Sequence, residues 1–360
     1  MTDESPVPLS CEDLSNPMTP QAESQLAAEE TRAGAGLPEP GDRSATPGAV
    51  PAGDWVTSRA PKLLEVFQRI FTLPVRMLVH RDLITTSVKR DLEARFSGTM
   101  LGWAWPLVHP MFLFVVYYFI FTKLLNFKIP NLPAGQESAL GIFMFCGIMS
   151  YATISEGVIR GANTFIENGN LIKKLAFPAE ILPLNISLVG TVTHSFGLVV
   201  FLLGCLLTPI WSAPTLSVVW IPAILAVQLV FIYGFALLLS TLQVFLRDTV
   251  QIVGIVMTVW MFVTPIFWVP ELMGESIDPY IGVIYNNPLY HLVSAWRGAL
   301  MGDLVIPAWT AGEVVHGPYH PVSTSGIAHH LGIFSLWAFG LYAVGYAFFT
   351  LSERRFADEV

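Results

Sequence analysis

Apolar residues gather in six long runs along the chain, each long enough to cross a lipid bilayer as a helix. A span takes about 20 apolar residues, because a helix rises about 1.5 Å per residue and the hydrocarbon core is about 30 Å thick. Lipid offers no partner to an open strand edge, so runs of this length predict helices. The six predicted spans are 106–125, 139–159, 182–208, 216–244, 249–269 and 329–351.

A seventh apolar stretch, 288–306, differs from these runs because it carries His291, Arg297 and Asp303. A charge at the centre of a bilayer costs about 2.5–3.5 kcal/mol on insertion scales. We therefore expect this stretch at the interface on the outer side of the membrane that the chain spans.

The basic residues around the spans predict the orientation, because cytoplasmic loops carry the excess of Lys and Arg. The side holding both termini is rich in Lys and Arg, whereas the opposite side has only Lys123, Lys128 and Arg297. Both termini are therefore expected on the cytoplasmic side of the membrane. The basic residues on the terminal side include Lys62, Arg69, Arg76, Arg81, Lys89, Arg90, Arg95, Arg160, Lys173, Lys174, Arg247, Arg354 and Arg355.

The composition agrees with a membrane protein. Hydrophobic residues make up 53% of the chain and charged residues only 13%, with a mean hydropathy of +0.57. A soluble domain carries about a quarter charged residues. The predicted fold class is therefore an all-α integral membrane protein.

The acidity of the chain belongs to its N-terminal tail. Residues 1–54 hold ten acids and two arginines, so the rest of the chain is neutral. The tail is rich in Pro, Ala, Ser and Gly and cannot bury enough surface to fold. It has no basic segment followed by an apolar one, so we expect no signal peptide. The predicted divisions are a disordered tail (1–60), an interfacial region (61–105), a six-span domain (106–352) and a cytoplasmic end (353–360).

The segment before the first span predicts an amphipathic helix that lies in the headgroup plane. Three arginines of this segment would lie at phosphate depth. Two interpretations stay open: an anchor held by anionic lipids, or a gate that receives a pyrophosphate through bidentate guanidinium bonds. The apolar stripe is formed by Ile84, Val88, Leu92 and Phe96, and the arginines are Arg81, Arg90 and Arg95.

The connection 168–180 is short but has an apolar, basic and again apolar order that ends at Phe177-Pro178. Such a segment, projecting from two long spans, can dock into a groove of a soluble partner. A plain positively charged turn is the alternative.

Few ionisable groups lie inside the spans. Glu156 and Arg160 are four residues apart, which suits an ion pair that lowers the burial cost of both, and we expect a structural pair rather than a proton carrier. His109 and His194 have no carboxylate at ligand spacing and are predicted to be core residues.

The remaining histidines and the cysteines suggest no chemistry. His316, His320, His329 and His330 are scattered over the predicted outer loop, which we expect to be solvated and to bind no metal. Two of the three cysteines fall in apolar runs, where cysteine packs as a small hydrophobe.

Aromatic residues on the first and fifth spans are candidates for a channel wall, because rings match the apolar C–H faces of sugars. Ordinary core or lipid packing is the alternative for each. The candidates are Phe114, Tyr117, Tyr118, Phe121, Trp260, Phe262, Phe267 and Trp268.

An ordered set of motifs resembles the type 2 ABC polysaccharide exporter permeases, the Wzm/TagG group. The set covers about 75–358, and the acidic tail and an enlarged outer loop (303–327) depart from the pattern. The motifs are Arg90-Asp-Leu-Glu-Ala-Arg95-Phe, Leu101-Gly-Trp-Ala-Trp-Pro106, Asn170-Leu-Ile-Lys-Lys-Leu-Ala-Phe-Pro178, Ile181-Leu-Pro-Leu, Arg247-Asp248, Thr264-Pro265, Asn287-Pro-Leu, Trp296-Arg297 and Glu353-Arg-Arg-Phe-Ala-Asp358.

The resemblance implies a permease that exports lipid-linked polysaccharide such as O-antigen, capsule or teichoic acid on an undecaprenyl- or polyprenyl-pyrophosphate carrier. It implies a homodimer with two ATPase subunits that bind ATP and Mg²⁺, and this chain has no Gly-x-x-x-x-Gly-Lys-Ser/Thr loop and needs no cofactor of its own. It also implies a pair of short re-entrant helices within 279–303 of the outer leaflet. The implied ATPase-coupling residues are Leu171, Ile172, Lys173, Lys174, Phe177, Pro178, Arg247 and Asp248.

Three other functions remain possible at this stage. A type 2 ABC exporter of a small lipid or drug would share the same architecture. An ion-coupled secondary transporter would need inverted repeats and charges near the midplane, which the sequence lacks. A membrane-embedded transferase would need clustered acids or histidines at a membrane face.

Overall fold

The computed structural model describes residues 63–126, 139–174, 178–207, 216–268, 279–301, 324–353 and 356. All of them belong to the second of two units, which begins at Asp54. Every regular element among these residues is helical, which confirms the all-α prediction. The elements are α2 (Leu63–Val79), α3 (Arg81–Phe96), η2 (Gly102–Ala104), α4 (Trp105–Phe119), η3 (Ile120–Leu124), α5 (Ala139–Glu167), α6 (Gly169–Lys174), α7 (Ile181–Leu207), η4 (Leu216–Trp220), α8 (Ile221–Phe245), α9 (Thr249–Val263), α10 (Ile281–Tyr285), α11 (Pro288–Met301) and α13 (Thr324–Ser352).

Four helices among the described residues are long and apolar enough to cross a membrane: Leu140–Glu167, Ile181–Leu203, Leu216–Phe245 and Gly326–Ser352. They correspond to the second, third, fourth and sixth predicted runs. The first run forms the 15-residue α4, continued by the π-helical turn η3, and the fifth forms the 15-residue α9. The chain is thus a multi-pass membrane protein.

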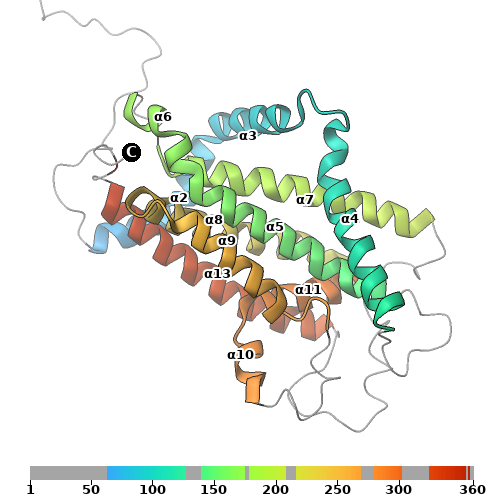
Figure 1. Ribbon diagram of the computed structural model, residues 1–360. Coiled ribbons are helices and arrows are strands. Elements are labelled where there is room, and N and C mark those ends of the chain that lie inside the picture. The colour runs from blue at the N-terminus through green and yellow to red at the C-terminus, as the bar shows by residue number, and fades with distance from the viewer. Residues whose placement is uncertain are drawn as a thin grey trace, which may run out of the picture. The chain divides into compact units, whose positions relative to one another are not determined.

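The long helices run side by side around α8 (Figure 1). α8 packs against α5 and α13. The buried helix α11 contacts both α5 and α13. Two glycines allow the closest approach, because a Cβ on Gly345 would lie 2.4 Å from the carbonyl oxygen of Gly234. The backbones of α8 and α13 therefore touch where neither residue has a side chain.

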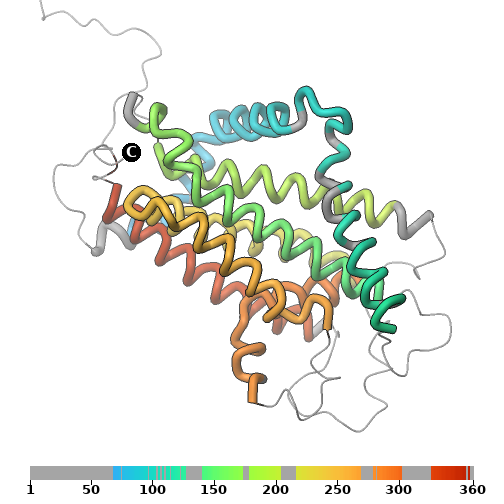
Figure 2. The backbone as a smooth tube through the Cα atoms, viewed as in Figure 1, coloured from blue at the N-terminus to red at the C-terminus, as the bar shows by residue number. Residues whose placement is uncertain are grey.

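α3 leads through a tight turn into α4, which crosses α7 (Figure 2). The turn needs its glycines, since Gly98 and Gly102 have φ of 71° and 48°. The apolar stripe of α3 packs on protein: Ile84 and Leu92 are buried, and Leu92 meets Val189 of α7. The side chain of Phe96 lies outside the description, and the depth of α3 in the membrane stays a prediction.

α9 ends early for a local reason. Thr264 is extended, with ψ of 130°, as expected for a residue before proline. The following turn is tied to the break between α10 and α11 by Asn287, whose Nδ2 donates to Thr264 Oγ1 at 2.9 Å. Asn287 Oδ1 accepts from Trp260 Nε1 at 2.9 Å and from the backbone N–H of Leu289 at 3.0 Å, at the start of α11.

The charged stretch 288–306 was expected at the outer interface of the membrane. The structure corrects this prediction, because the described part of the stretch is buried in protein. Protein surrounds α11, and Arg297 is buried. Its guanidinium donates to the carbonyls of Pro265 (2.8 Å), Ile266 (3.0 Å) and Phe143 (3.3 Å). Carbonyl acceptors supplied by neighbouring segments lower the cost of burying this charge, a compensation that hydropathy along the sequence does not register.

Candidate functional site

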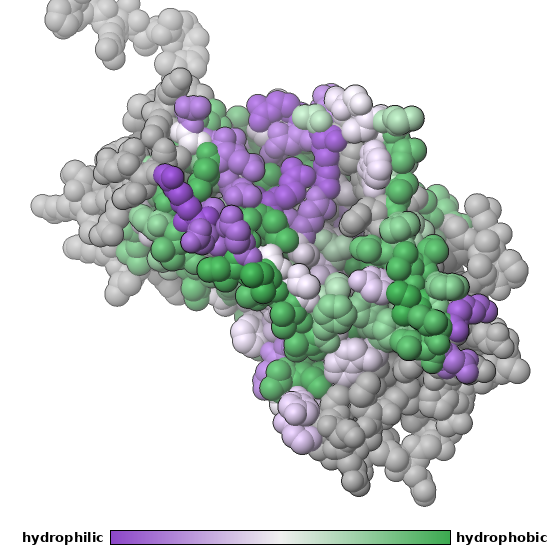
Figure 3. Space-filling view, in the orientation of Figure 1, coloured by the Kyte–Doolittle hydropathy of each residue, from purple (hydrophilic) through white to green (hydrophobic). Residues whose placement is uncertain are grey.

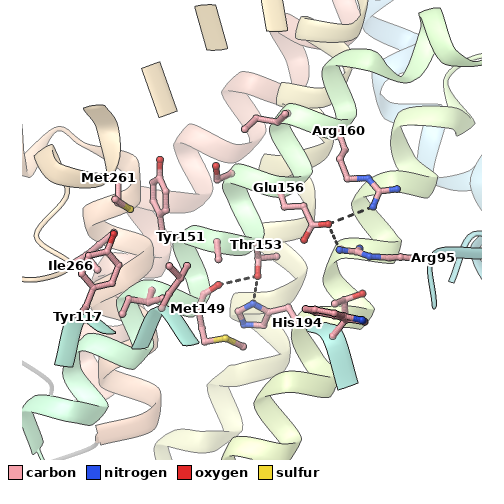
Figure 4. Close-up of a pocket in the computed structure, with 18 of the residues that line it drawn as sticks. Arg95, Tyr117, Met149, Tyr151, Thr153, Glu156, Arg160, His194, Met261 and Ile266 are labelled. Carbon is pink, nitrogen blue, oxygen red and sulfur yellow. Dashed lines mark hydrogen bonds and ion pairs between the residues drawn. The ribbon is translucent and has the colours of Figure 1, made fainter. Parts of the chain in front are cut away.

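A cavity of about 770 Å³ opens between α3, α4, α5, α7 and the turn after α9 (Figure 4). One side of its lining is polar, and the rest is lined by aromatic and aliphatic side chains. The polar part includes Arg95, Glu156 and Arg160, and the apolar part includes Tyr117 and Phe267. This combination is what an amphiphilic ligand requires.

Three charged side chains join α3 to α5 at the cavity. Arg95 donates from Nη2 to Glu156 Oε1, and Arg160 Nη1 lies 3.5 Å from the same oxygen. Glu156 and Arg160 are neighbours because they are one turn apart on α5, as the sequence predicted for a pair. Two guanidinium groups share one carboxylate, so the cluster keeps one positive charge in excess.

The wall beyond the charged cluster is built from α5 and α7. His194, which is buried, contacts the hydroxyl of Thr153 through Nδ1. The hydroxyl of Thr153 also lies 3.0 Å from the carbonyl of Met149. His194 therefore helps to pair two helices, and its ring lies 5.0 Å from that of Trp296. The side chain of His109 lies outside the description.

The aromatic part of the wall involves three of the predicted channel residues. The ring of Tyr117 lies 4.4 Å from that of Phe267, and Phe121 stacks on Phe267 at 5.5 Å. Tyr117 and Phe267 line the cavity directly.

The other predicted channel residues lie elsewhere. Trp260 bonds to Asn287, Trp268 donates from Nε1 to the carbonyl of Phe262 at 3.1 Å, and Phe262 is 58% exposed on the outer face of α9. Tyr118 is half-buried outside the cavity lining, and the side chain of Phe114 lies outside the description.

The three predicted headgroup arginines have different surroundings. Arg81 and Arg90 are largely exposed, 3.8 Å and 3.4 Å from the neighbouring Asp82 and Asp91. Among the three, only Arg95 lines the cavity.

The predicted coupling segment begins as the short helix α6, next to the end of α5 (Figure 1). Leu171 and Ile172 are half-buried and pack against the apolar cluster that includes Phe349 of α13. Pro178 is half-buried. Phe177 and the side chains of Lys173 and Lys174 lie outside the described residues.

The second predicted coupling point is the turn between α8 and α9. Arg247 and Asp248 are exposed there. Gln243 fixes the turn, because its Nε2 donates to the carbonyl of Arg247 at 2.9 Å and its Oε1 accepts from the N–H of Val250 at 3.1 Å.

The hydrophilic surface gathers over α3 and the adjoining end of α5, whereas α4 and α9 are covered by apolar residues (Figure 3).

Glu180 was given no role by the sequence, yet it is the buried acid at the base of the coupling segment. Its Oε2 accepts from Tyr346 of α13 at 3.0 Å, and its backbone carbonyl accepts from Tyr233 of α8 at 3.2 Å. Burial raises the pKa of its carboxyl, opposed by the Tyr346 bond and by nearby Arg76 and other basic groups of the N-terminal helices. The sequence signal is a lone acid two residues after Phe177-Pro178.

The histidine prediction needs a correction. His329 and His330 belong to α13 rather than to a loop, and His330 is buried instead of solvated. Its Nδ1 lies 2.9 Å from Nδ1 of His291, whose Nε2 lies 2.8 Å from the carbonyl of Tyr285. α13 begins at Thr324, five residues before the predicted start of the sixth span at residue 329, so both histidines lie inside the helix. Within the described ranges no three metal-binding side chains cluster, and His316 and His320 lie outside those ranges.

Comparison with known proteins supports the resemblance that the motifs suggested. The ABC-2 type transporter family matches residues 82–301, which is more than half of the chain and includes every wall of the cavity.

Three curated proteins are similar to this chain. Two are proteins of Klebsiella pneumoniae named O-antigen export system permease protein RfbA, with 28% and 26% identity over 61% and 62% of this chain and 80% and 82% of their own length. A Myxococcus xanthus protein with the same name is 28% identical over 61% of this chain and 80% of its own length. By its fold, its motifs and the extent of the family match, the chain belongs to the ABC-2 type transporter family.

Proposed function

We propose that this chain is the permease subunit of an ABC exporter that moves a lipid-linked polysaccharide across the inner membrane of a bacterium. The observation that carries the proposal is the cavity, which combines a cationic side with an aromatic wall. A polyprenyl-pyrophosphate glycan has a matching order of groups, since its pyrophosphate suits guanidinium and its sugar rings suit aromatic faces. The printed names of the three relatives point to the same class of substrate.

Arg95 is the residue to which we assign the first contact with the carrier. It lies on the helix before α4 and closes onto Glu156 of α5. A pyrophosphate carries more negative charge than one carboxylate, so it competes with Glu156 for Arg95 and Arg160. Exchange of one anion for the other would release α3 from α5 and widen the mouth.

The transport unit would contain two copies of this chain and two ATPase subunits. α4 and α9 border the cavity and keep apolar side chains uncovered, among them Phe112, Val115, Ile255 and Val259. A second copy would cover part of this surface and extend the cavity into a channel wide enough for a polymer. Six spans, both termini in the cytoplasm and short re-entrant helices formed by α10 and α11 complete the proposed architecture.

ATP binding is assigned to the partner, because the sequence holds no phosphate-binding loop of the Walker type. α6 with the following residues to Pro178 would enter a cleft of each ATPase, and the exposed turn at Arg247 and Asp248 would form a second contact. The attachment of Glu180 to α8 and α13 would pass the movement on to the spans.

The test is to co-purify the detergent-solubilised chain with the ATPase encoded beside it. We expect a complex of two and two subunits, which Lys173→Glu with Phe177→Ala weakens, while Lys89→Ala on exposed α3 leaves it unchanged. An exporter of small lipids or drugs would give the same complex. Stimulation of ATP hydrolysis by the added lipid-linked glycan distinguishes a polysaccharide exporter from such a protein. If no ATPase associates, the proposal is wrong.

A further inference from the structure

The helix α2 was not distinguished by its sequence pattern, and its surface has two apolar sides. One side packs onto the protein: Leu73 is 2% exposed, and Ile70 and Met77 contact the cluster that includes Tyr346 and Phe349 of α13. The opposite side carries a second apolar stripe with helical spacing. Its members are Phe71 (66% exposed), Val75 (62%), Leu78 (70%) and Val79 (73%).

The charged residues of α2 that the structure describes lie at its protein side. Arg69 Nη1 is 3.8 Å from Glu353 Oε2, and Arg76 acts on the buried Glu180. The exposed positions whose side chains are described are the four apolar residues together with Gln68 and Thr72, so the part of this surface formed by the described side chains carries no charge. A helix side exposed to water is normally polar or charged.

The neighbouring helix provides the contrast. α3 follows α2 directly, and apart from Leu83 and Ala94 its exposed residues are charged or carry hydroxyl groups, among them Thr85, Thr86 and Lys89. The two helices thus present different surfaces at the same end of the spans: α3 suits water, and α2 does not.

α2 is fixed beside a spanning helix that faces outward. Pro74 has no N–H, so the carbonyl of Ile70 lacks its usual partner in the helix, and the hydroxyl of Tyr342 donates to it at 2.9 Å. α13 itself is an outer span, with 28% of its apolar window buried against 78% for α5. Phe339, three residues before Tyr342 and therefore on the same side of α13, is 55% exposed. An uncovered apolar residue of the span therefore lies one helical turn from the tyrosine that holds α2.

We propose that α2 is an in-plane membrane anchor whose side formed by Phe71, Val75, Leu78 and Val79 is inserted among the acyl chains of the leaflet next to α6. Burial of large apolar side chains in lipid, with the cations kept on the protein side, is how an interfacial helix holds its depth. The anchor would fix Arg76 next to Glu180 and the start of α3. It is independent of which substrate is exported.

The test uses spin labels on the full-length chain, with its three native cysteines replaced by alanine, in phosphatidylcholine–phosphatidylglycerol nanodiscs. Labels at Val75→Cys and Leu78→Cys are compared with Leu336→Cys, which is 76% exposed on α13, and with Thr85→Cys and Lys89→Cys on α3. Collisions with oxygen, which concentrates in lipid, and with a water-soluble nickel chelate are measured at each site.

We expect oxygen to be the stronger collider at positions 75, 78 and 336, and the order to be reversed at 85 and 89. Preference for the nickel chelate at 75 and 78 would place this side in water and overturn the proposal. Exclusion of both oxygen and the nickel chelate would also overturn the proposal, because a protein surface would then cover α2. Exclusion seen with the chain alone would point to a second copy as the cover. Exclusion seen only after the complex has formed would point to the ATPase.

Discussion

At the scale of single residues, the function that we propose gives Arg95 two tasks at the cavity. It would hold α3 against α5 through Glu156 and would also bind an incoming anion. Arg160 Nη1 lies 3.5 Å from the same carboxylate oxygen, so Glu156 keeps a cationic neighbour when Arg95 is removed. A charge-reversed pair that keeps the contact between the two helices can therefore separate the two tasks.

We predict that Arg95→Ala raises the KM for the lipid-linked glycan roughly tenfold or more, because a hydrogen bond to a charged group contributes about 1.5–3 kcal/mol and about 1.4 kcal/mol corresponds to a factor of ten. The measurement is substrate-stimulated ATP hydrolysis of the reconstituted complex. Lys89→Ala is the matched control, since this cation is exposed on the same helix. The double variant Arg95→Glu with Glu156→Arg restores the contact between the helices. A wild-type KM in this double variant would show that the contact between α3 and α5 determines substrate affinity, and that Arg95 does not bind the anion itself.

Glu180 gives a prediction about pH. Its pKa is raised in the folded state by burial, so the folded chain holds this proton more tightly than the unfolded chain. The stabilising contribution is complete below the ordinary carboxyl pKa of about 4.3 and is lost as the pH rises through the raised pKa. Glu180→Gln stays neutral and keeps an acceptor for Tyr346.

The thermal midpoint of the wild type, measured in detergent against Glu180→Gln, should therefore fall relative to the variant as the pH rises from about 4 toward neutrality. Glu353→Gln, which removes a partly exposed partner of Arg69, is the control. A constant difference between the wild type and Glu180→Gln across this range would contradict a buried titrating carboxyl.

At the scale of elements, the pairing of α8 and α13 depends on two residues without side chains. Gly345→Ala would place Cβ 2.4 Å from the Gly234 carbonyl oxygen, so the helices must separate. We predict a loss of stability of about 1–3 kcal/mol, seen as a lower thermal midpoint. Gly340→Ala on the same helix meets nothing within 4 Å and should be neutral or slightly stabilising. Equal behaviour of the two variants would refute the close contact.

Elements were predictable where the apolar pattern is long and uninterrupted, as in 182–208 and 216–244, which became α7 and η4 with α8. The pattern failed where long-range partners decide. The charge on Arg297 suggested an interface, but three distant carbonyls accept its protons inside the protein. His330 looked like a loop residue, but His291 pairs with it in a buried place. α2 escaped notice because Pro74 and two arginines interrupt a run shorter than a span.

The site shows the same division. Glu156 and Arg160 are adjacent through helix geometry alone, so their proximity was predictable. Arg95 comes from a segment 61 residues away, and no local pattern tells it apart from Arg81 or Arg90. Likewise, rings on the first and fifth predicted spans were candidates for a channel wall, but only the packing of the helices brings Tyr117, Phe121 and Phe267 together.

At the scale of the whole molecule, protein covers the described helices unequally. α5 and α8 are the more enclosed helices, whereas α4 and α9 keep apolar side chains uncovered beside the cavity. In the assembly that we propose, a second copy would close the channel and an ATPase would move α6. The function we assign therefore belongs to the assembly, and it is tested best on the assembly.

The most direct measurement is ATP hydrolysis by the complex of this chain with its neighbouring ATPase in proteoliposomes, titrated with polyprenyl-pyrophosphate glycan, polyprenyl phosphate without sugar, and short-chain phospholipid. We predict stimulation by the glycan carrier, weaker stimulation by the sugar-free lipid and none by the phospholipid, and loss of the glycan effect in Arg95→Ala. Equal stimulation by all three lipids, or by the phospholipid alone, would contradict polysaccharide export and identify the chain as a permease for small lipids.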